Sequence, residues 1–236
     1  MIDHSNRGSG SVTRERILEI AEQLFHERGY GATGVATVLR AAGVRSGSLY
    51  HFFRGKEALL LGVLARHLAL LRIRVFEPVE RATDDPLERV FALLQLYMRN
   101  LESSGFTLGC LVGNLALEVA DTIPTARVPI DRYFDTWSGE VQRWLEAAGG
   151  RLPADADRPA LARTVLAVME GGVMQARAHR ELRPFAAAVG QLRSYLESLE
   201  ARARRERTES GQSPSGEGRH PDPTRRGING SAWRTW

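Results

Sequence analysis

Residues 13–60 read TRERILEIAEQLFHERGYGATGVATVLRAAGVRSGSLYHFFRGKEALL, and the spacing of apolar and small residues in this stretch decides the fold. Four apolar residues near its start recur with the helical period of 3.6 residues: Ile17, Ala21, Leu24 and Phe25. Thr13 is a good N-cap for that helix, and Gly29 can adopt the left-handed conformation that ends it. We therefore expect a first helix over about residues 13–28.

Two short helices are expected next. Thr33 is another capping residue and Gly43 can end a helix, so the second helix covers about residues 33–42. After the turn, Ser46 can cap a third helix of about two turns. That helix carries three apolar residues on one side: Leu49, Phe52 and Phe53. Helices this short are marginal alone in water, so all three must share one core.

This arrangement is typical of a helix-turn-helix, in which the second short helix enters the major groove of DNA. With its apolar side buried, that helix presents Gly47 and His51 on the opposite side and Ser48 and Tyr50 on the flanks. Small residues allow close approach of the backbone, and the polar side chains can donate hydrogen bonds to phosphates or base edges. Lys56 adds a positive charge at the start of the next helix.

The rest of the sequence also predicts helices, which begin or end at proline and glycine. They cover about residues 56–77, 86–103, 108–120, 124–148, 159–179 and 184–205. No convincing strand or internal repeat is present in the sequence. We therefore predict an all-α protein with an N-terminal helix-turn-helix domain and a C-terminal helical domain. The predicted segments are a disordered N-terminus (1–11), the helix-turn-helix domain (12–56), the helical domain (57–205) and a disordered basic tail (206–236).

Composition narrows the classes of function. A chain of 236 residues, 43% hydrophobic and 25% charged, suits one or two globular domains. No apolar run reaches the roughly 18 residues of a membrane span, and the polar N-terminus lacks the apolar stretch of a secretory signal. We therefore expect a cytoplasmic protein with no membrane partner. The net charge of +4 is weak evidence for nucleic-acid binding, because most of it lies in the C-terminal tail.

The sequence carries no signature of an enzyme or of a metal or cofactor site. The single cysteine, Cys110, excludes an internal disulfide and a multi-cysteine zinc site. No metal-ligand spacing relates the six histidines, which are His4, His26, His51, His67, His179 and His220. Neither a glycine-rich phosphate loop nor a nucleophile elbow is present. We expect no catalytic residues, no metal and no cofactor.

The stretch over about residues 13–61 resembles the N-terminal DNA-binding domain of the TetR family of bacterial transcriptional regulators. The resemblance lies in an ordered series of segments: LFHERGY at the end of the first helix, AT before the second, AAGV at the turn, then GSLYHFF and KEALL. Gly55 stands where the family commonly has a serine cap. The resemblance implies a homodimer that binds a palindromic operator in double-stranded DNA, with repression as the commoner mode.

The resemblance also implies DNA-binding roles for particular residues. Phosphate contacts are implied for Thr33, Tyr50 and Lys56. Positions near base edges are implied for Arg45, Gly47, Ser48 and His51, and Ser46 caps the helix that carries them. Arg45 is the candidate for base discrimination, because an arginine can reach O6 and N7 of a guanine together. A solvated charge or a phosphate contact remains the alternative for this arginine.

In the C-terminal helices the resemblance implies a site for a small-molecule inducer and a dimer interface. The candidate ligand-binding residues are Phe106, Cys110, Leu111, Asn114, Glu118, Tyr133, Trp137 and Met174. Ordinary core packing is the alternative for most of them. The last two helices are expected to contact the partner chain, and there Gly171 and Gly172 either permit close approach of helices or mark a kink. The helix that begins at Lys56 is the expected lever between inducer and DNA.

Two further interpretations stay open. Cys110 lies in GCLVGNLALE, which resembles a segment of some family members in which a cysteine senses oxidants or electrophiles, whereas inert burial is the alternative. A helical ligand-binding or scaffold protein that no longer binds DNA is the second interpretation. The polar face from Arg45 to Lys56 argues against it.

Overall fold

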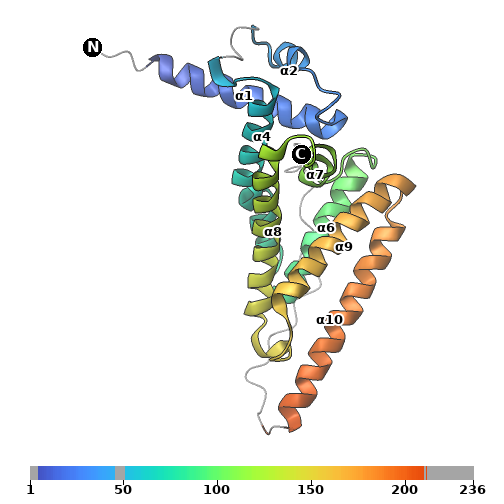
Figure 1. Ribbon diagram of the computed structural model, residues 1–236. Helices are drawn as coiled ribbons and strands as arrows, with labels where there is room; N and C mark the ends of the chain where they lie inside the picture. The colour runs from blue at the N-terminus through green and yellow to red at the C-terminus, as the bar shows by residue number, and fades with distance from the viewer. Residues whose placement is uncertain (1–4, 46–50, 210, 212–236) are drawn as a thin grey trace. The chain divides into compact units, whose positions relative to one another are not determined.

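The computed structural model of the chain describes residues 5–45, 51–209 and 211. Within these ranges the chain forms only helices and connecting turns, so the predicted all-α fold class is confirmed (Figure 1). The helices are, in chain order, α1 (Ser5–Arg28), α2 (Val35–Ala42), α4 (Lys56–Leu71), the π-helical η1 (Arg72–Phe76), α5 (Glu77–Ala82), α6 (Pro86–Ser103), α7 (Leu111–Val119), the 3₁₀-helical η2 (Pro124–Ala126), α8 (Arg127–Ala147), the 3₁₀-helical η3 (Gly149–Arg151), α9 (Arg158–His179) and α10 (Arg183–Glu209).

The first two helices end where the sequence predicts. Gly29 has a φ of 84°, and its N–H donates to the carbonyl of Phe25 at 2.9 Å. Gly43 has a φ of 65°, and its N–H donates to the carbonyl of Arg40 at 3.1 Å. Both glycines occupy the left-handed region, which residues with a side chain rarely adopt. The two predicted helix ends are therefore confirmed.

The predicted start of α1 is wrong. α1 begins at Ser5 rather than Thr13, so part of the N-terminus predicted as disordered (1–11) belongs to this helix. Glycine and serine have low helix propensity, which is why the local sequence favours a later start. A Cβ at Gly10 would lie 3.8 Å from Cε1 of Phe52, and this contact with a distant residue is one that local propensity does not reveal.

The third expected helix lies largely outside the described residues. The positions that fall there are Ser46, Gly47, Ser48, Leu49 and Tyr50. After them His51 and Phe52 are helical. His51 is exposed, whereas Phe53 is buried with 4% of its surface exposed. His51 is therefore exposed as predicted for the polar side, whereas Phe53, predicted on the apolar side, is buried but follows the helical residues, and Phe52 is half-buried.

The helix predicted over residues 56–77 is interrupted. Gly55 precedes α4 with a φ of 112° and a ψ of −176°, a conformation that glycine adopts far more readily than serine, which explains glycine at this cap. The α-helical hydrogen bonding ends at Leu71, and after the π-helical η1 the helix continues as α5 to Ala82. A π-helical turn has no distinct periodicity in the sequence, so this interruption was not predictable.

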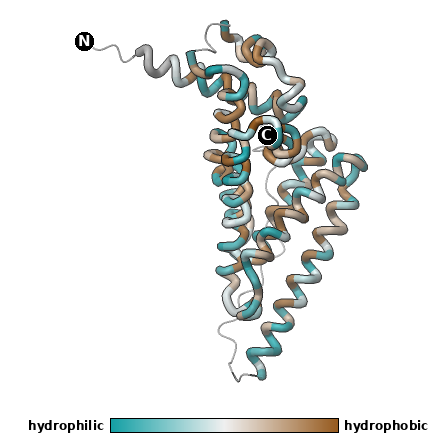
Figure 2. The backbone as a smooth tube through the Cα atoms, in the orientation of Figure 1, coloured by the Kyte–Doolittle hydropathy of each residue, from teal (hydrophilic) through white to brown (hydrophobic). Residues whose placement is uncertain are grey.

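The later helices follow the predictions closely. α6 has both bounds as predicted, and α7 to α10 differ from their predicted bounds by about one turn or less. α10 continues to Glu209, so the first residues of the tail predicted over 206–236 are helical. In Figure 2 this end of α10 is hydrophilic. Residues 210 and 212–236 lie outside the described residues.

The chain divides into two compact units. The first unit comprises Met1–Arg74 and Ser103–Thr136, and the second comprises Val75–Glu102 and Trp137–Trp236. The first unit therefore holds α1, α2, α4, α7 and the first part of α8. The compact units divide the chain at positions other than residue 56. The domain boundary predicted at residue 56 stays a prediction.

The core of the first unit forms where α1 packs on α2 and α4. The four residues of the predicted α1 stripe are all buried: Ile17, Ala21, Leu24 and Phe25. A Cβ at Gly62 of α4 would lie 2.8 Å from Cδ2 of Leu18 and 3.1 Å from Cε1 of Phe53. The missing side chain thus lets α4 approach α1 closely, and this approach fixes the module that carries the polar face.

The second unit has an aromatic core and a close contact between α9 and α10. Trp137 Nε1 donates to Tyr97 Oη at 3.1 Å, and both side chains are buried. A Cβ at Gly172 would lie 2.1 Å from Cδ2 of Phe185, whereas a Cβ at Gly171 would meet nothing within 4 Å. α9 is continuous through both glycines. Gly172 therefore serves close helix approach rather than a kink.

Candidate nucleic-acid interface

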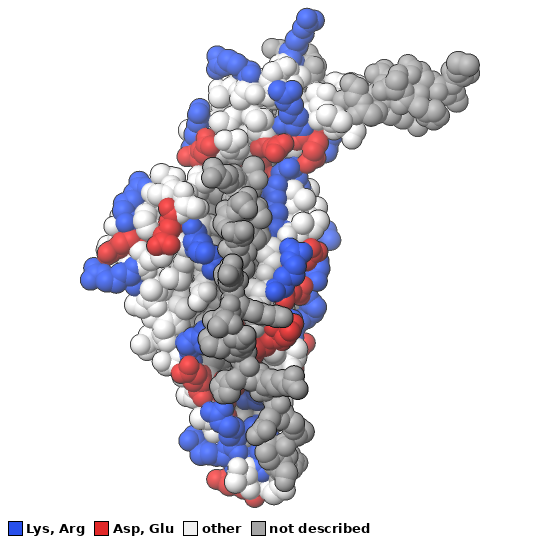
Figure 3. Space-filling view, turned by 180° about the vertical axis from the view of Figure 1, so that it is seen from behind, with Lys and Arg blue, Asp and Glu red and all other residues white. Residues whose placement is uncertain are grey.

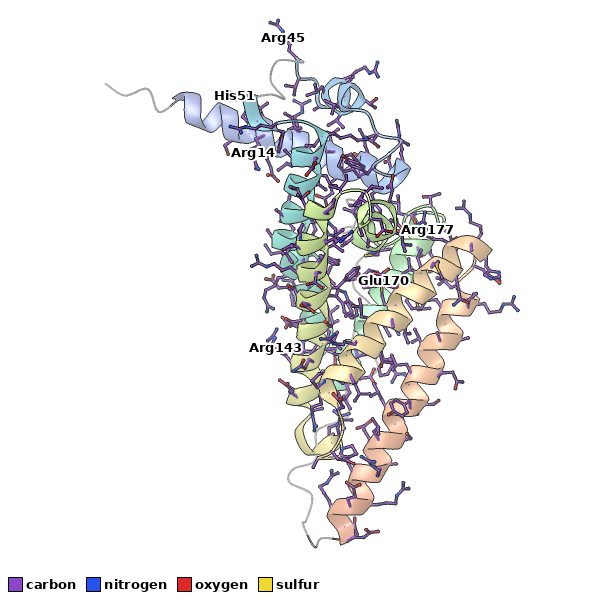
Figure 4. All side chains as sticks on the ribbon, viewed as in Figure 1. Arg14, Arg45, His51, Arg143, Glu170 and Arg177 are labelled. Carbon is purple, nitrogen blue, oxygen red and sulfur yellow. The ribbon has the colours of Figure 1, made fainter. Side chains whose placement is uncertain are left out.

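Basic side chains are exposed on α1, on α2 and on the segments that flank the third expected helix. They include Arg14, Arg40, Arg45, His51 and Arg54. Arg45 projects into solvent in Figure 4. On the face shown in Figure 3, the outermost side chains at this end of the molecule are Lys and Arg, with no Asp or Glu among them. This surface could bind a polyanion such as DNA.

The sequence prediction includes Arg45 and His51 but misses Arg14, Arg40 and Arg54. A single arginine on a helix gives no local signal, because its role depends on what lies beside it in the fold. Arg14 illustrates this, since its guanidinium carbon lies 5.2 Å from the centroid of the Phe53 ring. That cation–π contact holds a positive charge next to the third expected helix.

Thr33 does not face this surface. Its side chain is buried with 1% exposed, and its hydroxyl lies 2.7 Å from the carbonyl of Gly29 and 3.2 Å from that of Leu24. Its N–H donates to the carbonyl of Tyr30 at 3.1 Å. The predicted phosphate contact of Thr33 is therefore wrong, because the residue satisfies the last carbonyls of α1. Its predicted N-cap role is also wrong, since Gly34 is the N-cap of α2.

Lys56 lies against the loop between α1 and α2. Its Nζ donates to the carbonyl of Gly31 at 3.3 Å and lies 4.1 Å from the centroid of the Tyr30 ring. Burial lowers the pKa of the Lys56 ammonium, and the negative charge of Glu118 partly opposes that lowering. Lys56 thus supports the α1–α2 loop, and its phosphate contact stays a prediction.

Glu118 of α7 binds the same loop. Its Oε2 accepts the N–H of Tyr30 at 2.8 Å, and its Oε1 accepts the N–H of Gly31 at 2.5 Å. The carboxylate is exposed but turned toward the loop, so each oxygen already has a backbone donor. Glu118 therefore supports the loop in this structure, and its contact with a ligand stays a prediction.

An ion cluster joins α1 to α4 and η1, and sequence reasoning missed it. At its centre is the Glu22 carboxylate, which is 10% exposed. Its Oε1 accepts from Arg74 at 2.6 Å and lies 3.0 Å from Nδ1 of His67, and its Oε2 pairs with Arg66. Arg66 also pairs with Glu15. The only sequence signal is that Glu15 and Glu22 lie seven residues apart, on one side of α1.

The charged partners of Glu22 lower its pKa by more than burial raises it. Burial by itself would raise the pKa of Glu22. The hydrogen bond and charge of His67, with the charges of Arg74 and Arg66, act in the opposite direction and lower this pKa to about 2. Glu22 therefore stays ionised, and it holds α4 and α1 in one arrangement.

Three of the predicted ligand-binding residues lie together at the start of α7. Cys110 is 4% exposed and is the N-cap, where its Sγ accepts the N–H of Gly113 at 3.3 Å. Leu111 is 2% exposed, and Asn114 is half-buried one turn later. Phe106 lies in the preceding turn with a φ of 60°, a conformation that residues with a side chain rarely adopt.

The other predicted ligand-binding residues lie elsewhere. Tyr133 of α8 is 1% exposed, and its ring centroid lies 5.4 Å from that of His67 in the first unit. Trp137 and Met174 belong to the second unit. Trp137 is fully buried, but Met174 is 61% exposed on α9. Met174 is therefore not part of the buried core of this chain, and its contact with a ligand stays a prediction.

Two other kinds of feature are absent from the described residues. No helix there is long and apolar enough to span a membrane. Nor do three or more His, Cys, Asp or Glu side chains gather in that part of the chain as a metal site would need.

Comparison with known proteins identifies relatives of both halves of the chain. Residues 17–63 match the family described as bacterial regulatory proteins, tetR family. Residues 86–191 match the C-terminal domain of LmrA/YxaF-like transcriptional regulators. The first match covers α2, parts of α1 and α4 and the segment between α2 and α4, and it includes Arg40, Arg45, His51 and Arg54.

Individual relatives agree with these matches. The HTH-type transcriptional repressor NemR of Escherichia coli is 33% identical over 127 residues, which make up 54% of this chain and 64% of that repressor. The aligned stretch thus spans less than two thirds of NemR. The transcriptional regulator AcuR of Cereibacter sphaeroides is 31% identical over 176 residues, or 74% of this chain and 80% of that protein.

A solved structure extends the similarity to the fold. The crystal structure of the reduced form of E. coli NemR aligns with a TM-score of 0.69 and 27% identity, over 79% of this chain and 96% of that chain. The similarity therefore covers sequence, fold and both halves of the protein. On this evidence the chain belongs to the TetR family of bacterial transcriptional regulators, which are not enzymes.

Proposed function

We propose that the protein is a ligand-responsive transcriptional repressor that binds a palindromic operator as a homodimer and is released by a small-molecule inducer. The observation that carries this proposal is the exposed basic surface of Arg40, Arg45 and Arg54 on the part of the chain that matches the tetR family. The relative NemR is named a repressor, which favours repression over activation.

The proposed DNA contacts follow from the basic surface. Arg45 would read a base edge and His51 would lie beside it, while Arg14, Arg40 and Arg54 would contact phosphates. Lys56 has donors beyond the one that Gly31 accepts, and these would reach a phosphate. The remaining proposed contacts lie outside the described residues: Ser46, Gly47, Ser48 and Tyr50.

The proposed dimer would form through α9 and α10. Met174 of α9 is 61% exposed and Tyr195 of α10 is 50% exposed, and large apolar side chains on these two helices suit a contact with a second chain. A two-fold dimer presents two recognition helices at a fixed separation, so it requires an operator with two-fold symmetry. One half-site alone would bind weakly.

The proposed inducer would act through the helices that follow the DNA-binding module. The candidate contacts are Phe106, Cys110, Leu111, Asn114, Glu118, Tyr133, Trp137 and Met174. A ligand that prefers a conformation with the wrong separation of recognition helices would release DNA, with α4 as the lever. If a ligand that stabilises the protein against heat left operator affinity unchanged, this coupling would be rejected.

Mobility-shift titrations test the proposed function. DNA from the region upstream of the protein's own gene is titrated at several salt concentrations, with random-sequence DNA as competitor. A specific regulator retains a preference for one site and loses affinity steeply with salt. The variant Arg45→Ala is expected to lose about tenfold of operator affinity, whereas Arg132→Ala, which removes an exposed arginine of α8, retains it. Absence of any sequence preference would favour the alternative, a ligand-binding or scaffold protein without DNA binding.

A second candidate function is oxidant or electrophile sensing through Cys110. The observation in its favour is the N-cap position of the Sγ, where the positive end of α7 would stabilise a negative charge on sulfur. Hydrogen peroxide would oxidise this thiol to a sulfenic acid, with its O–O bond broken and one water released. The 4% exposure argues for inert burial. Release of DNA by peroxide that is unchanged in Cys110→Ser would eliminate sensing.

A further inference from the structure

Glu118 makes an unusual pair of contacts for an exposed side chain. Its two carboxylate oxygens accept the N–H groups of two consecutive residues, Tyr30 at 2.8 Å and Gly31 at 2.5 Å. Hydrogen bonds to a carboxylate are stronger than those between neutral groups. Consecutive N–H groups that point at one site form the kind of concavity that binds anions. Here the protein's own carboxylate fills it.

The loop is built around this contact. A Cβ at Gly31 would lie 2.9 Å from Oε1 of Glu118, closer than such atoms pack. A Cβ at Gly29 would lie 3.0 Å from Oε2, and Gly29 also has a positive φ of 84°. The loop is also held by Lys56, whose ammonium lies over Tyr30 and donates to the Gly31 carbonyl. Residues of both α7 and α4 thus hold the α1–α2 loop.

α7 is also attached to α1 near its other end. His26, in the last turn of α1, lies with its Nε2 2.7 Å from the carbonyl of Gly109, which precedes the N-cap of α7. Both ends of this short helix therefore contact the C-terminal end of α1 or the loop that follows it. α2 begins at Val35, only four residues after Gly31. A displacement of α7 would consequently reach α2 through a short and well-bonded path.

We infer that Glu118 is a positioning residue for DNA binding, which fixes the α1–α2 loop, and with it α2, on α7. α7 carries Cys110, Leu111 and Asn114 at its start and Glu118 near its end, so it joins the candidate ligand residues directly to the DNA-binding module. This route supplements α4 as the lever. The inference rests on the proposed function, because part of its test is operator affinity.

The first measurement is amide hydrogen exchange of the full-length protein without DNA. In Glu118→Ala the Tyr30 and Gly31 amides are expected to exchange about tenfold faster than in the wild type, since each loses a hydrogen bond to a charged group. Glu118→Gln offers one acceptor oxygen instead of two, so its exchange rates should lie between those of the wild type and Glu118→Ala. Asp131→Asn removes an exposed charge from α8 in the same unit and should leave both rates unchanged.

The second measurement is DNA affinity. Glu118→Ala is expected to lose about fivefold of operator affinity, the low end of typical coupling between sites, with little change on random-sequence DNA. Gly31→Ala is the matched variant, because it displaces the carboxylate by contact with the new Cβ but keeps the negative charge. Gly31→Ala should lose operator affinity by a similar factor. The double variant should lose no more than either single one, since both changes act on one contact.

The possible results separate the inference from the proposed function. Equal Tyr30 and Gly31 exchange in the wild type and Glu118→Ala would overturn the inference whatever the DNA result. Faster exchange with unchanged operator affinity in both variants would also overturn it, because the contact would then be structural only. A wild-type protein that binds no operator refutes the proposed function, and with it the positioning role, although the exchange result would still report on the contact itself.

Discussion

Replacement of Glu22 by glutamine would remove the carboxylate that Arg66, His67 and Arg74 share, while keeping the shape of the side chain. The three partners would then lie around a neutral amide in a site where the Glu22 side chain is only 10% exposed. Leaving a buried charge without its partner is strongly destabilising. We therefore expect Glu22→Gln to unfold more readily than the wild type.

The size of the effect follows from the pKa of Glu22. This pKa falls from an ordinary 4.5 to about 2 in the folded protein. The difference corresponds to about 3 kcal/mol of folding free energy, because one unit of pKa is worth about 1.4 kcal/mol. For a protein of this size, that loss lowers the midpoint of thermal unfolding by on the order of 10 °C.

The pH dependence distinguishes this cause from a general packing defect. A lowered pKa in the folded state means that the unfolded chain binds the proton more tightly. The contribution of the Glu22 charge is therefore complete above pH 4.5 and is lost as the pH falls toward 2. The gap in stability between wild type and Glu22→Gln should shrink to less than half between pH 7 and pH 3.

Urea unfolding followed by circular dichroism at the two pH values measures this gap. Glu19→Gln is the matched control, because it removes an exposed carboxylate from the same helix and should change stability by less than about 0.5 kcal/mol. Wild-type stability of Glu22→Gln at pH 7, or a gap of the same size at pH 7 and pH 3, would mean that the Glu22 charge does not stabilise the fold.

Three further predictions concern the second unit, and urea unfolding measures each of them. Gly172→Ala should lower the free energy of unfolding by about 2 kcal/mol, because its new Cβ would meet the Phe185 ring at 2.1 Å. An unchanged free energy would mean that α9 and α10 are not in close contact. Asp157→Ala should lower the free energy of unfolding by about 1 kcal/mol, because α9 loses its N-cap, and Asp157→Ser should keep most of the wild-type stability. Trp137→Phe should cost about 1 kcal/mol through the lost hydrogen bond to Tyr97, and an unchanged stability would show that the bond contributes nothing.

The helices were predictable where local chemistry specifies them. Gly29 and Gly43 end their helices because both adopt a positive φ that glycine tolerates. A glycine after the last apolar residue of a helical pattern is a signal visible in the sequence. The bounds of α6 were predictable for a similar reason, since Pro86 begins the helix and a strong apolar period follows. The early start of α1 was not predictable, because glycine and serine have low helix propensity.

The candidate site was less predictable, because its supports join residues far apart in the chain. Glu118 and Tyr30 are separated by 88 residues, and Glu22 and Arg66 by 44. Periodicity along one helix places Glu118 at the edge of the apolar side of α7 but cannot name its partner. Thr33 shows the opposite error, since a residue suited to a cap or a phosphate is instead buried against the end of α1.

We propose that the basic surface around Arg45 reads DNA sequence as part of a two-fold dimer. Selection of bound duplexes from a random-sequence pool, followed by sequencing, is the sharpest test of this proposal. We expect the wild type to enrich one inverted repeat, and Arg45→Ala to lose the preference at one position of each half-site. A pool that remains random after repeated rounds with the wild-type protein would rule out sequence-specific binding.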